Sequence, residues 1–134
     1  MRKPTWIVFD VTGVLIKSGK IDPDAWNLAK NLRKAGYKLA IFTNAITTNY
    51  SIVHKKSESE NPKIFETIIK SSSKGFLKPE PESYRYVESI LKASGDEIFF
   101  IDDFPENTSA ARELFNWQVH TFGSVEELRK LLLT

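Results

Sequence analysis

Four groups of polar residues follow apolar runs of the sequence and carry side chains that can act on phosphate. They are Asp10, Thr43-Asn44, Lys78 and Asp102-Asp103. A carboxylate can attack phosphorus and form a covalent intermediate, and acidic groups around it can hold Mg²⁺. A hydroxyl with nearby backbone amides can bind phosphate oxygens, and a lysine offsets the charge of phosphate and carboxylates. Together these residue types suit phosphoryl transfer.

The apolar runs before these residues have the character of buried strands. Residues 6–9 form an unbroken apolar run that ends at Asp10, as expected of a central strand of a parallel sheet. Further strands are expected at 37–42, 64–69, 97–101 and 117–122. Because the carboxyl ends of parallel strands meet at one edge of the sheet, residues far apart in the sequence can meet there.

Helical patterns alternate with these strands. Asp22 is an expected N-cap, Pro23 suits the first helical position, and Gly36 ends that helix. A small hairpin is expected around Ser18-Gly19. Further helices are expected at 46–56, where the Thr and Ser content is poor for a helix, and at 81–93, 105–115 and 125–133. The pattern predicts an α/β fold: a three-layer, Rossmann-like, doubly wound parallel sheet of five strands, in a single domain over residues 1–134.

Composition excludes several classes of protein. The chain has 134 residues and a net charge of +2, which gives little support to dedicated nucleic-acid binding. It has no cysteine, which excludes disulfides, thiol catalysis and thiolate metal sites. The apolar run near the N-terminus is four residues long and ends in Asp10, which does not suit a signal peptide or a membrane span. We therefore expect a cytoplasmic protein without membrane contact.

Four segments, in order, resemble the motifs of the haloacid dehalogenase-like (HAD) superfamily. They are IVFDVTGVL at 7–15, KLAIFTN at 38–44, GFLKPEPESY at 75–84 and FFIDDFPENTSAA at 99–111. Each segment alone is weak evidence, but all four occur in order and at workable spacing over nearly the whole chain. Most members of this superfamily are phosphatases that work through an aspartyl-phosphate. The resemblance therefore implies a phosphohydrolase or phosphotransferase with the minimal core of that fold.

The resemblance also implies a Mg²⁺ site. Asp10 would be both the catalytic nucleophile and a metal ligand, and the backbone carbonyl of Thr12 would bind the metal. Asp103 would complete the site, with Asp102 binding directly or through water, and the sequence does not decide which of the two binds directly. Taken alone, Asp102 and Asp103 could instead be an N-cap pair for the helix expected at 105–115.

The remaining implied roles concern the phosphorylated substrate. Thr43 and the following backbone amide, that of Asn44, would bind phosphate. Lys78 would bind phosphate and orient it against the nucleophile. Without the other motifs, Thr43 would be an ordinary cap residue and Lys78 an ordinary surface lysine.

Thr12 departs from the pattern of the superfamily. Typical phosphatases of this type have an aspartate there, which protonates the leaving group and later activates water. Thr12 keeps the metal-binding carbonyl but cannot transfer that proton, and losing a general acid/base costs roughly 10² to 10⁴-fold in rate. P-type ATPases resemble this chain only at that motif, also have Thr there, and keep a long-lived aspartyl-phosphate. We therefore expect slow or specialised turnover.

The chain also leaves little room for a cap domain, which family members often insert after the first motif or between the second and third. Six residues lie between Leu15 and Asp22, and the 34 between Thr43 and Lys78 are needed for a helix, a strand and loops. The sequence therefore predicts a capless site. An open site suits a macromolecular substrate, or one covered by a neighbouring subunit of a homo-oligomer.

One other function remains open, and a further one is disfavoured by the order of the motifs. Thr12 and the missing cap are compatible with a catalytically degenerate phosphoryl-binding or protein-interaction module of the same fold. A response-regulator receiver uses a similar set of Asp, Thr and Lys, but it places the acidic pair at the first strand. Here the pair follows the fourth expected strand, which argues against a receiver.

Overall fold

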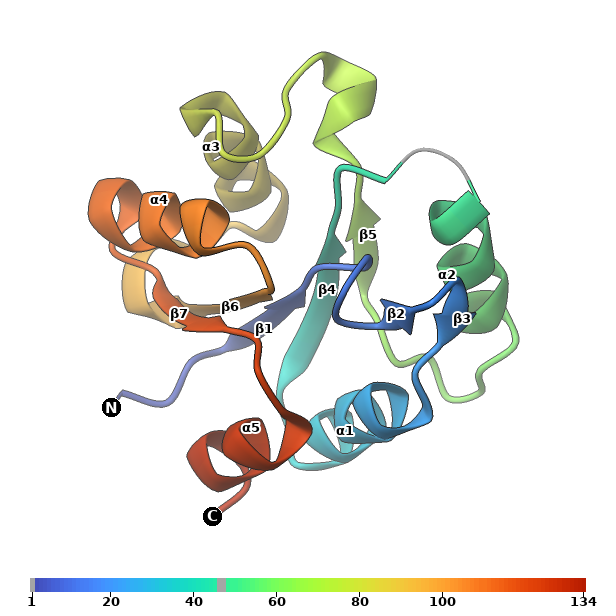
Figure 1. Ribbon diagram of the computed structural model, residues 1–134. Coiled ribbons are helices and arrows are strands. Elements are labelled where there is room, and N and C mark those ends of the chain that lie inside the picture. Colours follow the sequence, from blue (N-terminus) through green and yellow to red (C-terminus); the bar gives the residue numbers. More distant parts are fainter. Residues whose placement is uncertain (1, 46–47) are drawn as a thin grey trace.

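The computed structural model describes residues 2–45 and 48–134, and its centre is a five-stranded parallel sheet (Figure 1). The strands stand in the order β5-β4-β1-β6-β7, so β1 is central. Their bounds are Trp6–Phe9 for β1, Lys38–Phe42 for β4, Thr67–Ile69 for β5, Ile98–Asp102 for β6 and Gln118–Thr121 for β7. All four neighbouring pairs are parallel, which confirms the predicted α/β sheet.

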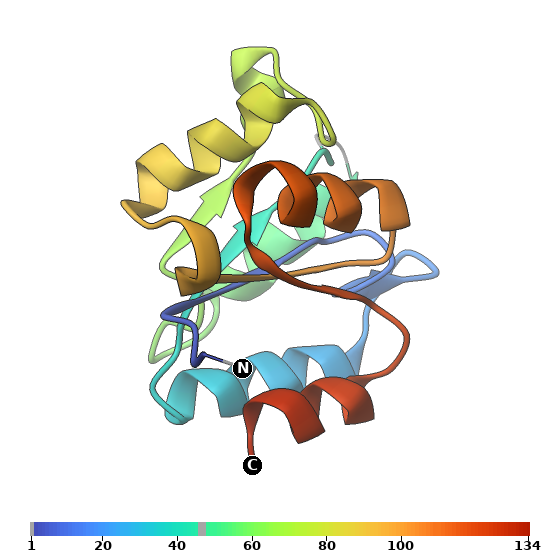
Figure 2. The same ribbon diagram turned by 90° about the vertical axis from the view of Figure 1, so that its left-hand side faces the viewer.

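Side chains of the central strand alternate between two apolar cores, as the pleat of a strand requires. Ile7 and Phe9 lie in one core and Val8 lies in the other. Helices α1 (Pro23–Lys34) and α5 (Val125–Leu132) cover the first face, and α3 (Pro81–Leu91) and α4 (Pro105–Phe115) cover the second (Figures 1 and 2). The result is the predicted three-layer arrangement, with β1 buried on both faces.

The connection from β1 to α1 contains the expected hairpin. Strands β2 (Ile16–Lys17) and β3 (Lys20–Ile21) pair antiparallel around Ser18 and Gly19, which both have left-handed backbone angles. Glycine tolerates such angles without strain, and two consecutive left-handed residues suit a two-residue hairpin turn. Asp22 then caps α1 as predicted, because its side chain accepts a hydrogen bond of 3.2 Å from the amide of Ala25.

Some boundaries differ from the prediction. The third predicted strand, 64–69, is shorter in the structure because Ile64 and Phe65 precede β5 and pack into the core from a loop; the Phe65 ring meets Phe9 edge to face at 5.9 Å. Helix α3 ends at Leu91, where Lys92 takes a left-handed conformation. Short 3-10 turns occupy Ser71–Lys74 and Gly95–Glu97.

The helix predicted at 46–56 is present as α2 (Thr48–Glu58), and the predicted residues 46 and 47 lie outside the described residues. Val53 is its buried residue, and it joins the core beneath α1 and α5. None of the helices in the described part of the chain is long and apolar enough to cross a membrane.

Candidate phosphoryl-transfer site

The predicted polar residues meet at the carboxyl edge of the sheet. Asp10 directly follows β1, Thr43 directly follows β4, and Asp102 is the last residue of β6, so three adjacent strands each deliver one polar side chain. The seven residues predicted for the site all line one hollow of about 210 Å³: Asp10, Thr12, Thr43, Asn44, Lys78, Asp102 and Asp103. The structure therefore brings together every residue that the sequence assigned to the site.

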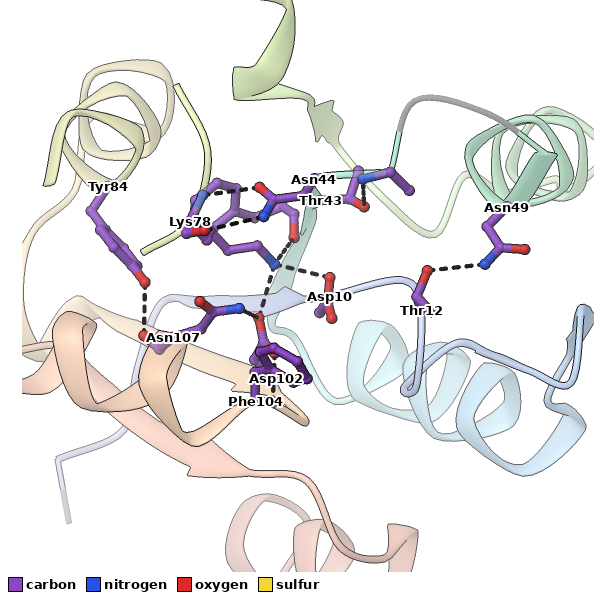
Figure 3. A network of polar contacts seen from close by, with 12 residues as sticks. Asp10, Thr12, Thr43, Asn44, Asn49, Lys78, Tyr84, Asp102, Phe104 and Asn107 are labelled. Atoms are coloured by element: carbon purple, nitrogen blue, oxygen red, sulfur yellow. Dashed lines mark hydrogen bonds and ion pairs between the residues drawn. The ribbon is translucent and has the colours of Figure 1, made fainter. Parts of the chain in front are cut away.

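Lys78 links the strand ends from the loop before α3. Its Nζ donates to Oδ1 of Asp10 at 2.9 Å and to Oδ2 of Asp102 at 2.9 Å (Figure 3). A third bond of 3.0 Å goes to the carbonyl oxygen of Phe42. All three protons of the ammonium are thus used, and its side chain is 1% exposed. Bonds of this kind between charged groups are short and strong, and they fix the lysine against the carboxylate of Asp10.

Asp102 is held on both of its oxygens. Oδ1 accepts from the backbone amide of Phe104 at 2.9 Å, while Oδ2 accepts from Lys78 and, at 3.1 Å, from the side-chain amide of Asn107. The bond to Phe104 orders the chain just before α4, so Asp102 also has part of the helix-start role that was the alternative for the acidic pair. Tyr84 donates to the carbonyl oxygen of Asn107 at 2.8 Å and thereby ties α3 to the start of α4.

Three carboxylates could share a cation. Asp10, Asp102 and Asp103 each offer an oxygen, and these oxygens lie within 4.8 Å of one another. Oxygen donors are the ligands that Mg²⁺ prefers. When ionised, the three carboxylates and the single ammonium of Lys78 leave two negative charges uncompensated, and a divalent cation would neutralise them. The residues present therefore fit a Mg²⁺ ion.

The pKa shifts of two of these carboxyl groups also favour a bound cation. Burial raises the pKa of Asp10 to about 6; Lys78 opposes this rise and the charge of Asp102 adds to it. Burial and the charge of Asp102 also raise the pKa of Asp103. Burial and like charges both disfavour the ionised carboxylates, so a nearby cation would favour the ionised nucleophile.

Gly13 allows Asp103 to approach the first loop. A β-carbon at position 13 would overlap Oδ2 of Asp103, and the φ angle of Gly13 is +84°. Both features require glycine, because side chains disfavour this backbone region and would occupy the space of the carboxylate. The glycine of the first motif therefore serves the packing of the fourth motif as well as the turn after Asp10.

Thr43 and Asn44 have different local roles. The Thr43 hydroxyl oxygen accepts from the amide of Ala45 at 2.9 Å, which leaves its proton to be donated elsewhere. The side chain of Asn44 instead forms two bonds with the backbone of Lys78, donating to its carbonyl at 3.2 Å and accepting from its amide at 3.0 Å. Asn44 thus holds the lysine segment against β4, and its predicted role in phosphate binding rests on its backbone amide.

Three further residues at this edge had no role predicted from the sequence. Asn107 lies in the first turn of α4, directly after the acidic pair of the fourth motif, and that place is the signal that could have found it. Asn49 donates from α2 to the hydroxyl of Thr12 at 3.0 Å, but it lies in the stretch with the weakest sequence pattern. Phe104 lines the hollow and is largely exposed, and nothing distinguished it in the sequence from the other phenylalanines.

A larger hollow, about 450 Å³, lies between α2 and β5. Its ionisable groups include His54, whose side chain is half exposed and lies 3.6 Å from Glu58. Solvent-exposed pairs of this kind are common on protein surfaces and contribute little to the stability of the fold. We therefore place the chemistry in the smaller hollow, where a buried lysine and three carboxylates converge.

Replacing Lys78 by Met should destabilise the fold by about 3–5 kcal/mol, because it leaves two buried carboxylates without their cation. Urea unfolding measures this loss. The loss should be smaller at about pH 5 than at about pH 8, since protonation of Asp10 removes one of the uncompensated charges. The exposed Lys74→Met variant is the control. An equal, small change in the free energy of unfolding in both variants would contradict the role of Lys78 as the cation that stabilises Asp10 and Asp102.

The chain is similar to known proteins both in sequence and in structure. A family model described as haloacid dehalogenase-like hydrolase matches residues 16–114, which include the second, third and fourth motifs but begin after Thr12. The chain is 30% identical over 105 residues to bifunctional epoxide hydrolase 2 of Rattus norvegicus, covering 77% of this chain and 19% of that protein. It is 32% identical over 99 residues to haloacetate dehalogenase H-2 of a Moraxella species, covering 72% and 42%.

A sesquiterpene phosphatase of Aspergillus oryzae is 29% identical over 120 residues, covering 86% of this chain and 60% of that protein. The chain thus spans between about a fifth and three fifths of the length of these relatives.

Solved structures share the fold. A HAD-family enzyme of Bacteroides thetaiotaomicron superimposes with a TM-score of 0.80 at 18% identity, covering 97% of this chain and 98% of that chain. A structure of the wild-type Bacteroides enzyme in complex with magnesium and inorganic phosphate superimposes with a TM-score of 0.66 at 27% identity, covering 78% and 54%.

Proposed function

This chain belongs to the haloacid dehalogenase-like hydrolase family, and we propose that within it the chain is a Mg²⁺-dependent phosphohydrolase or phosphotransferase that acts through Asp10. The observation that carries the proposal is the bridge from Lys78 to both Asp10 and Asp102, at 2.9 Å each, beside the carboxylate of Asp103. This arrangement holds one carboxylate as a nucleophile and leaves oxygen donors for a cation. A phosphatase among the relatives, and the structural neighbour that binds magnesium and inorganic phosphate, support phosphoryl transfer over the other activities of the family.

The chain's own residues would divide the reaction among them. An oxygen of Asp10 attacks phosphorus, the bond between phosphorus and the leaving oxygen breaks, and the electron pair stays on that oxygen. The hydroxyl of Thr43 and the amide of Asn44 donate to the phosphoryl oxygens, while the ammonium of Lys78 keeps Asp10 in place and offsets negative charge. Water then attacks phosphorus, the bond between phosphorus and the Asp10 oxygen breaks, and its electron pair restores the carboxylate. Inorganic phosphate leaves, and the proton of the attacking water passes to solvent.

Asp10, the backbone carbonyl of Thr12 and Asp103 would hold Mg²⁺, with Asp102 in direct contact or linked through water. When bound, the ion neutralises charge that develops on the phosphoryl oxygens. The hydroxyl of Thr12 can donate a hydrogen bond but cannot supply a proton as a carboxylic acid does, so the departure of the leaving group is unassisted and turnover is slow.

The chain connections around the site are short. Over the described residues, β1 is joined to α1 by the short β2–β3 hairpin, and β4 is joined to β5 through α2. With these short connections we propose a single capless domain whose site is open to a phosphorylated substrate, including a phosphorylated macromolecule, or is covered by a neighbouring copy of the chain. We propose a cytoplasmic location for this activity.

Thr12 favours a second candidate function, a module that binds phosphoryl groups without turnover. Such a module would bind Mg²⁺ and a phosphoryl mimic such as beryllofluoride, while hydrolysis would stay absent even with a carboxylate restored at position 12. The two candidates differ in whether Asp10 becomes covalently modified.

Intact mass after incubation with Mg²⁺ and acetyl phosphate tests the proposal. We expect an increment of one phosphoryl group that maps to Asp10 and persists, because Thr12 cannot activate water to remove it. The increment should disappear when Mg²⁺ is chelated and in Asp10→Asn. An unmodified mass, together with no phosphate release from a broad panel of esters, would reject the enzyme and favour the binding module.

A further inference from the structure

We propose that this site selects aryl phosphate monoesters, in which phosphate is attached to a phenolic oxygen, over alkyl esters and over substrates with a second anionic group. The proposal deepens the proposed function and rests on it for turnover. It draws on three features of the described residues: the charge balance of the hollow, the exposed ring of Phe104, and the chemistry available at Thr12.

The hollow is small and has little positive charge to offer. Its volume of about 210 Å³ is below the roughly 300–1,000 Å³ of typical ligand pockets, so a phosphoryl group fits inside and the rest of the substrate lies at the mouth. Among the described residues, Lys78 is the one basic residue that lines it, and its ammonium is already bound to Asp10, Asp102 and a backbone carbonyl. A second phosphate or carboxylate on the substrate would therefore find no free cation among the described residues that line the hollow, which disfavours nucleotides and bisphosphates.

Phe104 offers an apolar surface where the leaving group must lie. Phe104 lines the hollow and is 57% exposed as a residue, whereas the neighbouring Asp102 is fully buried. The position of Phe104 is fixed from both sides, because its amide donates to Asp102 and Pro105 begins α4 directly after it. An aromatic ring at the end of an ordered backbone can stack with a flat leaving group at little cost in conformational entropy.

Thr12 selects for the same leaving group by a different route. In the first step the oxygen of Asp10 bonds to phosphorus and the P–O bond of the ester breaks, leaving the electron pair on the departing oxygen. An alkoxide needs a proton as it leaves, and the hydroxyl of Thr12, which accepts a bond from Asn49, is too weak an acid to give one. A phenolate is far more stable, departs unprotonated and takes its proton from water afterwards. Aryl esters therefore need no general acid.

Binding is tested without turnover, with phenylphosphonate and cyclohexylphosphonate as probes in the presence of Mg²⁺. Calorimetry should give phenylphosphonate an affinity about 3- to 10-fold higher, as expected for an aromatic pair. Phe104→Ala should abolish this preference. The control is Leu114→Ala, which truncates a similarly exposed apolar residue (59%) near the end of α4 and should leave the preference intact. Equal affinities in the wild type, or a preference that survives in Phe104→Ala, would overturn the role of Phe104.

Turnover is tested with phenyl phosphate, cyclohexyl phosphate and a fluorinated alkyl phosphate whose alcohol is as acidic as phenol. We expect kcat/KM to be at least about 10²-fold higher for phenyl than for cyclohexyl phosphate, with the fluorinated ester between them. Phe104→Ala should raise KM for phenyl phosphate and leave the fluorinated ester unchanged. Equal rates for phenyl and cyclohexyl phosphate would overturn the proposal. Failure of the proposed function gives a different result, in which no ester is hydrolysed and Asp10 stays unmodified. In that case the affinities for the two phosphonates still test whether the site prefers an aryl group.

Aryl phosphates occur both as small esters and as phosphotyrosine in polypeptides. A phosphotyrosine peptide and the same peptide with phosphoserine distinguish these sources. A kcat/KM for the phosphotyrosine peptide above that for phenyl phosphate identifies a polypeptide substrate, and a value below it identifies a free ester. Equal turnover of the phosphotyrosine and phosphoserine peptides would contradict the selectivity.

Discussion

Asp10→Asn should abolish Mg²⁺-dependent release of phosphate from phenyl phosphate, with a loss of at least about 10³-fold in kcat. The amide cannot attack phosphorus, so the covalent step is lost. The fold should survive, because the amide oxygen can still accept the bond that Lys78 now makes to Oδ1 at 2.9 Å, and the substitution removes a charge that burial disfavours. Phosphate release and thermal unfolding, measured on the same preparation, separate the two effects.

Asp24→Asn is the matched control for this variant. Asp24 lies exposed in the first turn of α1, outside the hollow, so the same chemical change there should leave phosphate release unaltered. If Asp10→Asn kept the activity of the wild type, Asp10 would not be the nucleophile and the proposed mechanism would be wrong.

Thr12→Asp should raise turnover of an alkyl phosphate by about 10² to 10⁴-fold, because it supplies the general acid and base that the chain lacks. Two features of the structure favour this outcome. The side-chain amide of Asn49, which donates to Thr12 at 3.0 Å, can donate to the new carboxylate and hold it. The acidic groups nearby would raise the pKa of that carboxyl group, which suits an acid that must carry a proton near neutral pH.

Thr12→Asn controls for shape, since it matches Asp in size but cannot transfer the proton. It should leave turnover near that of the wild type. The higher kcat/KM for esters of more acidic alcohols or phenols should become smaller only in Thr12→Asp. No gain in Thr12→Asp, with the phosphoryl mimic still bound, would mean that the site is impaired elsewhere and would favour the binding module.

The centre of the fold was predictable because its signals are local. The apolar run of β1, the acidic residue at its end and the repeated alternation with helices lead directly to a parallel sheet with polar residues at one edge. The order of the four motifs then placed Lys78 near Asp10 and Asp102, although nothing in the spacing indicated that one ammonium would bind both carboxylates. That bridge arises from the loop before α3 reaching over the ends of two strands.

The less predictable parts depend on tertiary contacts. β5 is shorter than the apolar run at 64–69 suggests, because Phe65 packs on Phe9 instead of pairing with β4. The roles of Asn44 and Asn49 could not be foreseen, since both amides make contacts with residues more than thirty positions away. Phe104 is an ordinary phenylalanine in the sequence, and only its exposure beside the hollow distinguishes it.

The contacts of Lys78 also affect how the molecule opens. Its ammonium joins the ends of β1, β4 and β6, and Asn44 fastens the backbone of the same segment to the end of β4. Local opening of this loop would expose two buried carboxylates and break five hydrogen bonds together, so it is nearly as costly as separating the strands themselves. A loop at the surface thereby belongs to the same cooperative unit as the sheet, and its amides should exchange with solvent at rates typical of the core.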